Sequence, residues 1–251
     1  MGAPKLFIFG VDGVLRDSSK ALNEGIARGF ISVGLPHVFT SGEVWNMGGI
    51  GKYNSRERLV EALYTMSVLK IDPKEILCLP GAEERLDYLI AHNLHDADRH
   101  RIEQICRTSR EFSNSQRAKY MVKEIPNSRD ALDILTLKSR NAALFTNSGI
   151  DTLYRDLGNI GLKRFSYILS KEGVKNKKPS GEGLKKIMAH LKVSPEETVH
   201  IGDTVSDVKA AKDAGCLSAA VLSGMGLKHH LEREKPDYLS EDALSLIAEF
   251  G

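Results

Sequence analysis

Short apolar runs alternate with amphipathic segments from residue 127 to the end of the chain. Continuous apolar runs are typical of parallel strands that are buried on both faces of a sheet. The alternation therefore predicts βαβ units around a parallel sheet, which the apolar residues 6–9 would join. The expected strands are residues 142–145, 165–169, 198–201 and 218–222, and the expected helices are residues 128–139, 151–160, 181–191 and 205–214.

Residues 17–126 have a different pattern, in which strand-like runs almost vanish and helical spacing dominates, as at Leu59, Leu63 and Met66. The very polar residues 95–123 indicate a mostly exposed helix or a pair of helices. We therefore expect an α/β fold with a doubly wound, Rossmann-like parallel sheet. Its core is built from residues 1–16 and 127–251, and an all-helical domain of residues 17–126 is inserted into it.

Composition narrows the class of protein. With 41% hydrophobic and 27% charged residues, the chain is typical of a soluble globular protein. A net charge of +2 does not favour a nucleic-acid partner, and no apolar run approaches the roughly 20 residues that a membrane helix needs. The first residues have no signal-peptide pattern, and the 3 cysteines form no CxxC pair. We expect a cytoplasmic protein with no membrane partner.

Polar residues follow the strands of the predicted sheet. In such sheets, ligands bind outside the carboxyl ends of the strands, so these side chains are expected to share one site. The residues are Asp12 after the first strand, Thr146 and Asn147 after the second, Lys178 in the loop "KNKKPS", and Asp203 and Asp207 after "VHIG".

Each of these residues also has an ordinary structural explanation. Asp12 and Gly13 form a common turn dipeptide, and Asp203 could cap a helix. Lys178 belongs to a lysine-rich loop that would normally be solvated. The combination, in this order and at successive strand ends, favours a functional site over a series of coincidences.

Four motifs of the chain resemble those of the haloacid dehalogenase (HAD) superfamily of phosphohydrolases, in its phosphoglycolate-phosphatase-like branch. They are "FGVDGVL" at residues 9–15, "LFTNS" at 144–148, Lys178–Pro179, and "GDTVSD" at 202–207. The resemblance covers nearly the whole chain. It implies that the helical residues 17–126 are a cap domain.

The resemblance also implies a function, a Mg²⁺-dependent hydrolase of phosphomonoesters that acts on a small phosphorylated metabolite. Asp12 would donate a proton to the leaving oxygen and then help to activate water. Thr146 and Asn147 would bind the phosphoryl group, and Lys178 would offset its charge. The implied metal ligands are Asp12, Asp203 and Asp207.

Gly10 departs from the family pattern, because the family has its nucleophilic Asp at this position. Glycine has no side chain with which to attack phosphorus or hold a metal. Three explanations remain open: the nucleophile was removed by engineering, a natural member lost hydrolysis but kept binding, or a metal-bound water attacks directly and slowly. The alternative function is a non-catalytic protein that binds a phosphorylated metabolite or a protein partner.

The stretch "GGIGKY" at residues 48–53 is not a phosphate-binding P-loop, because the first glycine and the final Ser or Thr of that pattern are missing. It lies in the expected cap. Lys52 and Arg56 are therefore candidates for contacts to an anionic part of the substrate, although a solvated helix start explains them equally well.

Overall fold

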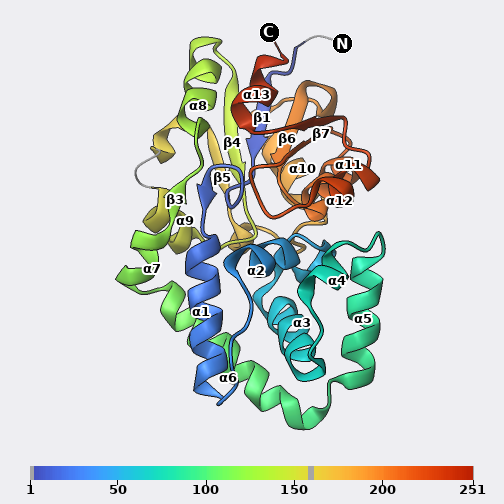
Figure 1. Ribbon diagram of the computed structural model, residues 1–251. Helices are drawn as coiled ribbons and strands as arrows, with labels where there is room; N and C mark the ends of the chain where they lie inside the picture. Colours follow the sequence, from blue (N-terminus) through green and yellow to red (C-terminus); the bar gives the residue numbers. More distant parts are fainter. Residues whose placement is uncertain (1–2, 158–160, 251) are drawn as a thin grey trace. The chain divides into compact units, whose positions relative to one another are not determined.

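A computed structural model of the chain describes residues 3–157 and 161–250 (Figure 1). The chain divides into two compact units, Met1–Asp17 with Lys123–Gly251, and Ser18–Val122. From the sequence we expected the boundaries after residues 16 and 126. The end of the helix expected at 151–160 lies outside the described residues.

The first unit is built on a six-stranded parallel sheet with the strand order β5-β4-β1-β6-β7-β8. This order confirms the doubly wound α/β fold. The last strand, β8, was not expected from the sequence, because it is a short edge strand of three residues. The six strands are β1 (Leu6–Phe9), β4 (Asn141–Phe145), β5 (Tyr167–Leu169), β6 (Thr198–Gly202), β7 (Leu217–Val221) and β8 (Tyr238–Ser240).

Helices cover both faces of this sheet (Figure 1). Successive side chains of a strand point to opposite faces, and β1 is buried on both. Phe7 and Phe9 pack with α8 (Ser128–Leu137), α9 (Ile150–Leu157) and α13 (Ala243–Ala248). Leu6 and Ile8 pack with α10 (Glu182–Leu191) and α11 (Val205–Ala214). The two apolar layers hold the carboxyl ends of β1, β4 and β6 in one row.

A two-stranded antiparallel ribbon, β2 (Arg16–Asp17) with β3 (Lys123–Glu124), completes the first unit. Asp17 is paired with Lys123 across this ribbon. The two points at which the chain leaves and re-enters the unit are therefore joined by backbone hydrogen bonds.

The second unit contains only helices among its described elements. The polar residues 95–123 were expected to form one helix or a pair of helices, and they form the pair α6 and α7. The helices of this unit are α1 (Ser19–Ser32), α2 (Ser41–Gly48), the 3₁₀ helix η1 (Gly51–Asn54), α3 (Arg56–Leu69), α4 (Pro73–Leu77), α5 (Ala82–Asn93), α6 (Asp96–Ser113) and α7 (Gln116–Met121).

Two glycines of α1 allow close packing against α6. A Cβ atom at Gly29 would lie 2.7 Å from the carbonyl oxygen of Ile105, and one at Gly25 would lie 3.1 Å from that of Ser109. Side chains at these positions would push the helices apart, because real Cβ contacts are longer. The close α1–α6 packing therefore requires glycine at position 29, whereas position 25 is tight.

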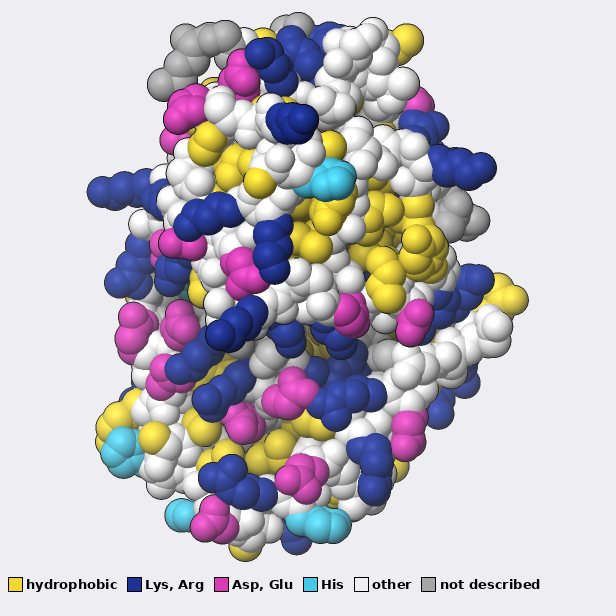
Figure 2. Space-filling model, turned by 180° about the vertical axis from the view of Figure 1, so that it is seen from behind, with side chains coloured by type: hydrophobic (Ala, Val, Ile, Leu, Met, Phe, Trp, Pro, Cys, Tyr) yellow, Lys and Arg dark blue, Asp and Glu magenta, His cyan; other side chains and the backbone are white. Residues whose placement is uncertain are grey.

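Opposite charges are mixed on the surface. On the face shown in Figure 2, Lys and Arg side chains lie among Asp and Glu side chains. The basic residues of α6 follow this rule, since Arg99 pairs with Asp96 and Arg110 pairs with Glu57. In the described part of the chain, no helix is both long and apolar enough to span a bilayer.

Candidate active site

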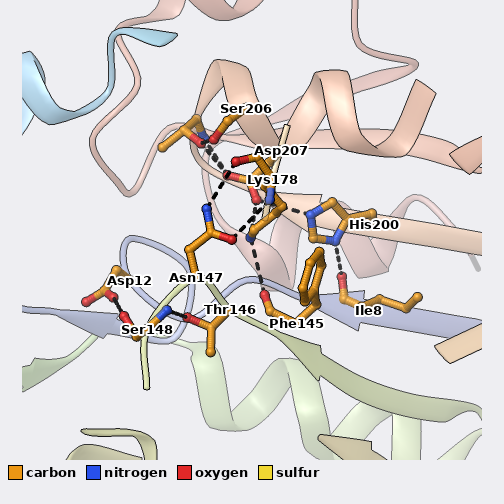
Figure 3. A network of polar contacts seen from close by, with 11 residues as sticks. Ile8, Asp12, Phe145, Thr146, Asn147, Ser148, Lys178, His200, Ser206 and Asp207 are labelled. Atoms are coloured by element: carbon orange, nitrogen blue, oxygen red, sulfur yellow. Dashed lines mark hydrogen bonds and ion pairs between the residues drawn. The ribbon is translucent and has the colours of Figure 1, made fainter. Parts of the chain in front are cut away.

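The carboxyl ends of β1, β4 and β6 bring most of the polar side chains expected from the sequence to one edge of the sheet, where they form two groups of polar contacts (Figure 3). Asp12 follows β1, Thr146 and Asn147 follow β4, and Asp207 lies in the first turn of α11, after β6. The loop before α10 brings Lys178 to the same edge, where its backbone N–H donates to Asn147 Oδ1 (3.1 Å). The contacts link residues that are far apart in the sequence.

Asp12 forms an ion pair with Arg16. The guanidinium donates from Nε to Oδ1 (2.8 Å) and from Nη2 to Oδ2 (2.9 Å), so both carboxylate oxygens accept. The Ser148 hydroxyl lies 3.4 Å from Oδ2 (Figure 3). Arg16 is only 4% exposed. Such paired hydrogen bonds fix the orientation of a carboxylate as well as its charge.

Next to this pair, the ends of β1 and β4 present unused hydrogen-bond donors. Among the described residues, the backbone N–H groups of Val11 and Asn147 donate to no protein acceptor. Val11 is buried, and a buried N–H group normally has a partner. Thr146 Oγ1 accepts from the Ser148 N–H (3.0 Å), which leaves its own proton for donation. The described structure therefore leaves three hydrogen-bond donors at this edge without a protein acceptor.

Lys178 provides a buried positive charge in this row. Its Nζ lies 2.5 Å from Asp207 Oδ1 and donates to the Phe145 carbonyl at 3.2 Å. The Asn147 side chain holds the lysine backbone from both sides, because its Nδ2 also donates to the Lys178 carbonyl (3.3 Å). The lysine is therefore fixed in position and is only 7% exposed.

Asp207 is saturated with protein donors. Its Oδ1 accepts from Lys178 and contacts His200 Nε2 (3.1 Å), while its Oδ2 accepts from the Thr204 N–H (3.1 Å) and hydroxyl (2.5 Å). Burial alone would raise the pKa of Asp207, but Lys178 and His200 hold that pKa well below its usual value. Asp207 thus remains ionised and positions Lys178.

Asp203 has a different environment from Asp207. Its Oδ2 accepts from the Met225 N–H (2.7 Å). The backbones of Gly13 and Gly224 lie so close to the carboxyl group that a side chain at either glycine would collide with it. Burial, with the nearby charge of Asp207 as the second cause, raises the pKa of Asp203 to about 8. The structure therefore encloses a carboxyl group that has no paired cation among the described residues.

Replacing Asp203 with Asn is expected to stabilise the fold, increasingly so as pH rises from about 4 to about 8. In that window the folded protein keeps the Asp203 proton and the unfolded chain loses it, so the wild type loses stability with rising pH. Asn can still accept from the Met225 N–H. Thermal unfolding at pH 5 and pH 8 measures the effect, and a gain of about 1–3 kcal/mol at pH 8 would raise Tm by several degrees.

The surface variant Asp133→Asn is the matched control, because Asp133 is 53% exposed. Its effect on Tm should change little between the two pH values. An Asp203→Asn gain that did not grow with pH would contradict the proposed environment of Asp203.

Gly10 lies at the end of β1, with its N–H donating to the Ile201 carbonyl (2.7 Å). Its φ angle is not positive, so L-amino acids can adopt its conformation. A Cβ atom here would lie 3.3 Å from the Ile201 carbonyl oxygen and 3.3 Å from Val14 Cγ2, which is tight but needs shifts of only a few tenths of an ångström. The backbone can therefore carry a side chain at this position.

Lys52 and Arg56 belong to the helical unit and have partners inside it. Lys52 Nζ lies 2.7 Å from Asp87, and Arg56 Nη1 donates to the hydroxyl groups of Ser109 (2.5 Å) and Ser113 (3.0 Å). These contacts join neighbouring helices of the unit. A substrate contact for either residue stays a prediction.

Sequence reasoning missed Arg16, His200 and Ser148. His200 could have been noticed as the one ionisable residue within the apolar run of β6, where its Nδ1 contacts the Ile8 carbonyl (2.9 Å). Arg16 lies four residues after Asp12, a spacing that reads as part of a polar turn. Neither signal specifies a partner, because both contacts depend on how the loops fold.

The three carboxylates expected to hold Mg²⁺ do not fit that ion as they are arranged. Asp12 accepts from Arg16 on both oxygens, and Asp207 accepts from protein donors on both. Only Asp203 has an oxygen that accepts from no described donor. Over residues 3–157 and 161–250, no group of three or more His, Cys, Asp or Glu is placed to hold a metal ion. Oxygens already paired with cations are poor ligands for a hard ion.

The chain matches a family model described as haloacid dehalogenase-like hydrolase over residues 7–221. It is 29% identical over 160 residues to a pyrophosphatase PpaX of Anoxybacillus flavithermus, covering 61% of this chain and 72% of that protein. It is 28% identical over 127 residues to a phosphoglycolate phosphatase of Salmonella choleraesuis, covering 50% of each. The matched segments thus span only part of these relatives.

Solved structures share the fold. A haloacid dehalogenase-like family hydrolase of Streptococcus pneumoniae superposes with a TM-score of 0.69 at 19% identity, covering 99% of each chain. A hydrolase of Pseudomonas syringae gives a TM-score of 0.69 at 18% identity and covers 97% of this chain and 96% of the other. The family model covers most of the chain, so the chain belongs to the haloacid dehalogenase-like hydrolases, as its motifs indicated.

Proposed function

We propose that the chain binds a small phosphorylated molecule at the carboxyl edge of its sheet, and that Gly10 impairs the phosphomonoester hydrolysis typical of its family. The observation that carries this proposal is the pair of unpartnered backbone N–H groups, at Val11 and Asn147, beside Thr146 and Lys178. Backbone N–H groups and a lysine are a common cradle for phosphoryl oxygens. The two relatives named above, both phosphatases of phosphate esters or anhydrides, support the same class of ligand.

The residues of the cradle would each have one task. Thr146 and the two N–H groups would donate hydrogen bonds to phosphoryl oxygens, while Lys178 would offset their charge. Asp12 is the group that could exchange a proton with the leaving oxygen. Covalent phosphoryl transfer needs a carboxylate that attacks phosphorus, and Gly10 cannot supply it. In this scheme the chain keeps anion binding, and its hydrolysis is slow.

Phosphatases of this family generally use Mg²⁺. In this chain we assign the need for Mg²⁺ to hydrolysis rather than to binding, because both oxygens of Asp12 and of Asp207 are already in contact with protein donors. Restoring Asp at position 10 would add a carboxylate at the end of β1, next to β6 and Asp203. We therefore propose Mg²⁺ dependence for the restored enzyme.

A second candidate function is binding without catalysis, and the missing side chain at position 10 favours it. Calorimetry and turnover assays with the same phosphate ester separate the two. Binding without hydrolysis identifies a binding protein, whereas slow hydrolysis identifies an impaired enzyme. Absence of binding for inorganic phosphate and for a panel of phosphate monoesters would contradict both.

Thr146→Val is expected to weaken the binding of inorganic phosphate about tenfold, because the variant keeps the shape of the side chain and loses one hydrogen bond to a charged ligand. Isothermal titration calorimetry measures the change. Thr136→Val is the matched control, since the Thr136 hydroxyl donates to the Leu132 carbonyl within α8. If both variants bound phosphate as tightly as the wild type, Thr146 would not be part of the cradle.

A further inference from the structure

Arg16 is a buried cation that has no role in the proposed function. It lies in the short strand β2 and holds both oxygens of Asp12. Its side chain is 4% exposed, whereas Arg99 and Arg110 form their ion pairs on the surface of helix α6. An arginine remains charged at any physiological pH. Its positive charge is therefore a permanent part of this edge of the sheet.

Two of the three carboxylates at this edge of the sheet are compensated by protein cations. Lys178 compensates Asp207, and Arg16 compensates Asp12, each through direct contacts. Asp203 is enclosed by glycine backbone and the Met225 N–H. A divalent cation would normally offset the carboxylates of such a site so that an anion can enter. Here two protein cations compensate Asp12 and Asp207.

We propose that Arg16 takes the electrostatic place of a divalent cation, so that this chain binds a phosphoryl anion without metal. This inference rests on the proposed function, because it concerns the same anion cradle. By neutralising Asp12, Arg16 removes the repulsion that a free carboxylate would exert on the phosphate next to it. The unpartnered N–H groups of Val11 and Asn147 then bind the anion beside a carboxylate whose charge is compensated.

The first test compares the binding of inorganic phosphate by the full chain in EDTA and in excess Mg²⁺, using isothermal titration calorimetry. We expect dissociation constants that agree within about threefold. Binding that appears only with Mg²⁺ overturns this inference and leaves the proposed function intact. Binding in neither condition overturns the proposed function, and the inference with it.

The second test removes the charge of Arg16. Arg16→Met should weaken phosphate binding in EDTA about tenfold or more, because it leaves Asp12 uncompensated. The double variant Asp12→Asn with Arg16→Met removes both charges and should recover affinity to within about threefold of the wild type. Arg129→Met is the matched control, since Arg129 forms a similar pair with Glu124 but is 50% exposed.

These variants keep the inference falsifiable even if one of them is unstable, and circular dichroism checks that each is folded. An Arg16→Met protein that binds phosphate as tightly as the wild type overturns the role of Arg16. A folded double variant that stays as weak as Arg16→Met does the same, because compensation of Asp12 is then not the reason for the effect.

Discussion

Gly10→Asp is expected to raise the rate of phosphomonoester hydrolysis by roughly 10⁴–10⁶-fold, equivalent to about 5–8 kcal/mol of transition-state stabilisation. The substitution would supply, at the end of β1 and beside the proposed anion cradle, the carboxylate that the resemblance to the family implies as the nucleophile. The φ angle of Gly10 is not positive, and its surroundings need move only slightly. Turnover of an aryl phosphate in the presence of Mg²⁺ measures the effect.

Gly10→Asn is the control for this experiment, because it matches Asp in size and cannot act as the nucleophile. Equal rates for the two variants would show that position 10 does not carry the attacking group. A Mg²⁺ titration gives an independent result, since the Asp variant should bind the ion more tightly than the Asn variant. Equal affinity would mean that position 10 is not a metal ligand.

Lys178→Met is expected to destabilise the first unit by about 3–5 kcal/mol, because it leaves the buried carboxylate of Asp207 without its cation. Lys178 and Asp207 are 7% and 6% exposed, so water cannot take the place of the lysine. Unfolding in urea, followed by circular dichroism, measures the loss. Phosphate binding should weaken as well, because the cradle loses its lysine.

Lys185→Met is the matched control. Lys185 pairs with Asp213 at 3.5 Å, and both side chains are more than half exposed (53% and 54%), so its loss should cost less than about 0.5 kcal/mol. The double variant Lys178→Met with Asp207→Asn should recover part of the stability. If Lys178→Met and Lys185→Met were equally stable, the buried pair would not contribute to the fold as described.

Most of the sheet could be predicted from the sequence because its strands are buried on both faces. A strand such as β1 must then be apolar at every position, which is an unusual pattern that local sequence reveals. β8 has only three residues at the edge of the sheet, so too few positions are constrained to give a signal. The expected bounds of α11 are confirmed, whereas those of α8 and α10 differ by one or two residues, because caps and turns, not periodicity, end a helix.

The sequence predicts those residues of the site that lie at the ends of strands. Asp12, Thr146 and Asp207 stand directly after strands or one helical turn beyond, and parallel strands place these points at one edge. The hydrogen-bond partners of these residues could not be predicted. That Arg16 turns back onto Asp12, and that His200 contacts Asp207 from within a strand, depends on side-chain orientations that no sequence period encodes.

The β2–β3 ribbon makes the helical unit an exchangeable module. Asp17 and Lys123 face each other across the ribbon, so the inserted unit begins and ends at one place, as a hairpin loop does. Every member of the anion cradle belongs to the other unit. A helical unit of different sequence, or a short turn, could therefore be joined to the same two residues without breaking a strand of the main sheet. The residues of the proposed anion cradle and the inserted helices are thus in separate units, and the chain passes between these units at one ribbon.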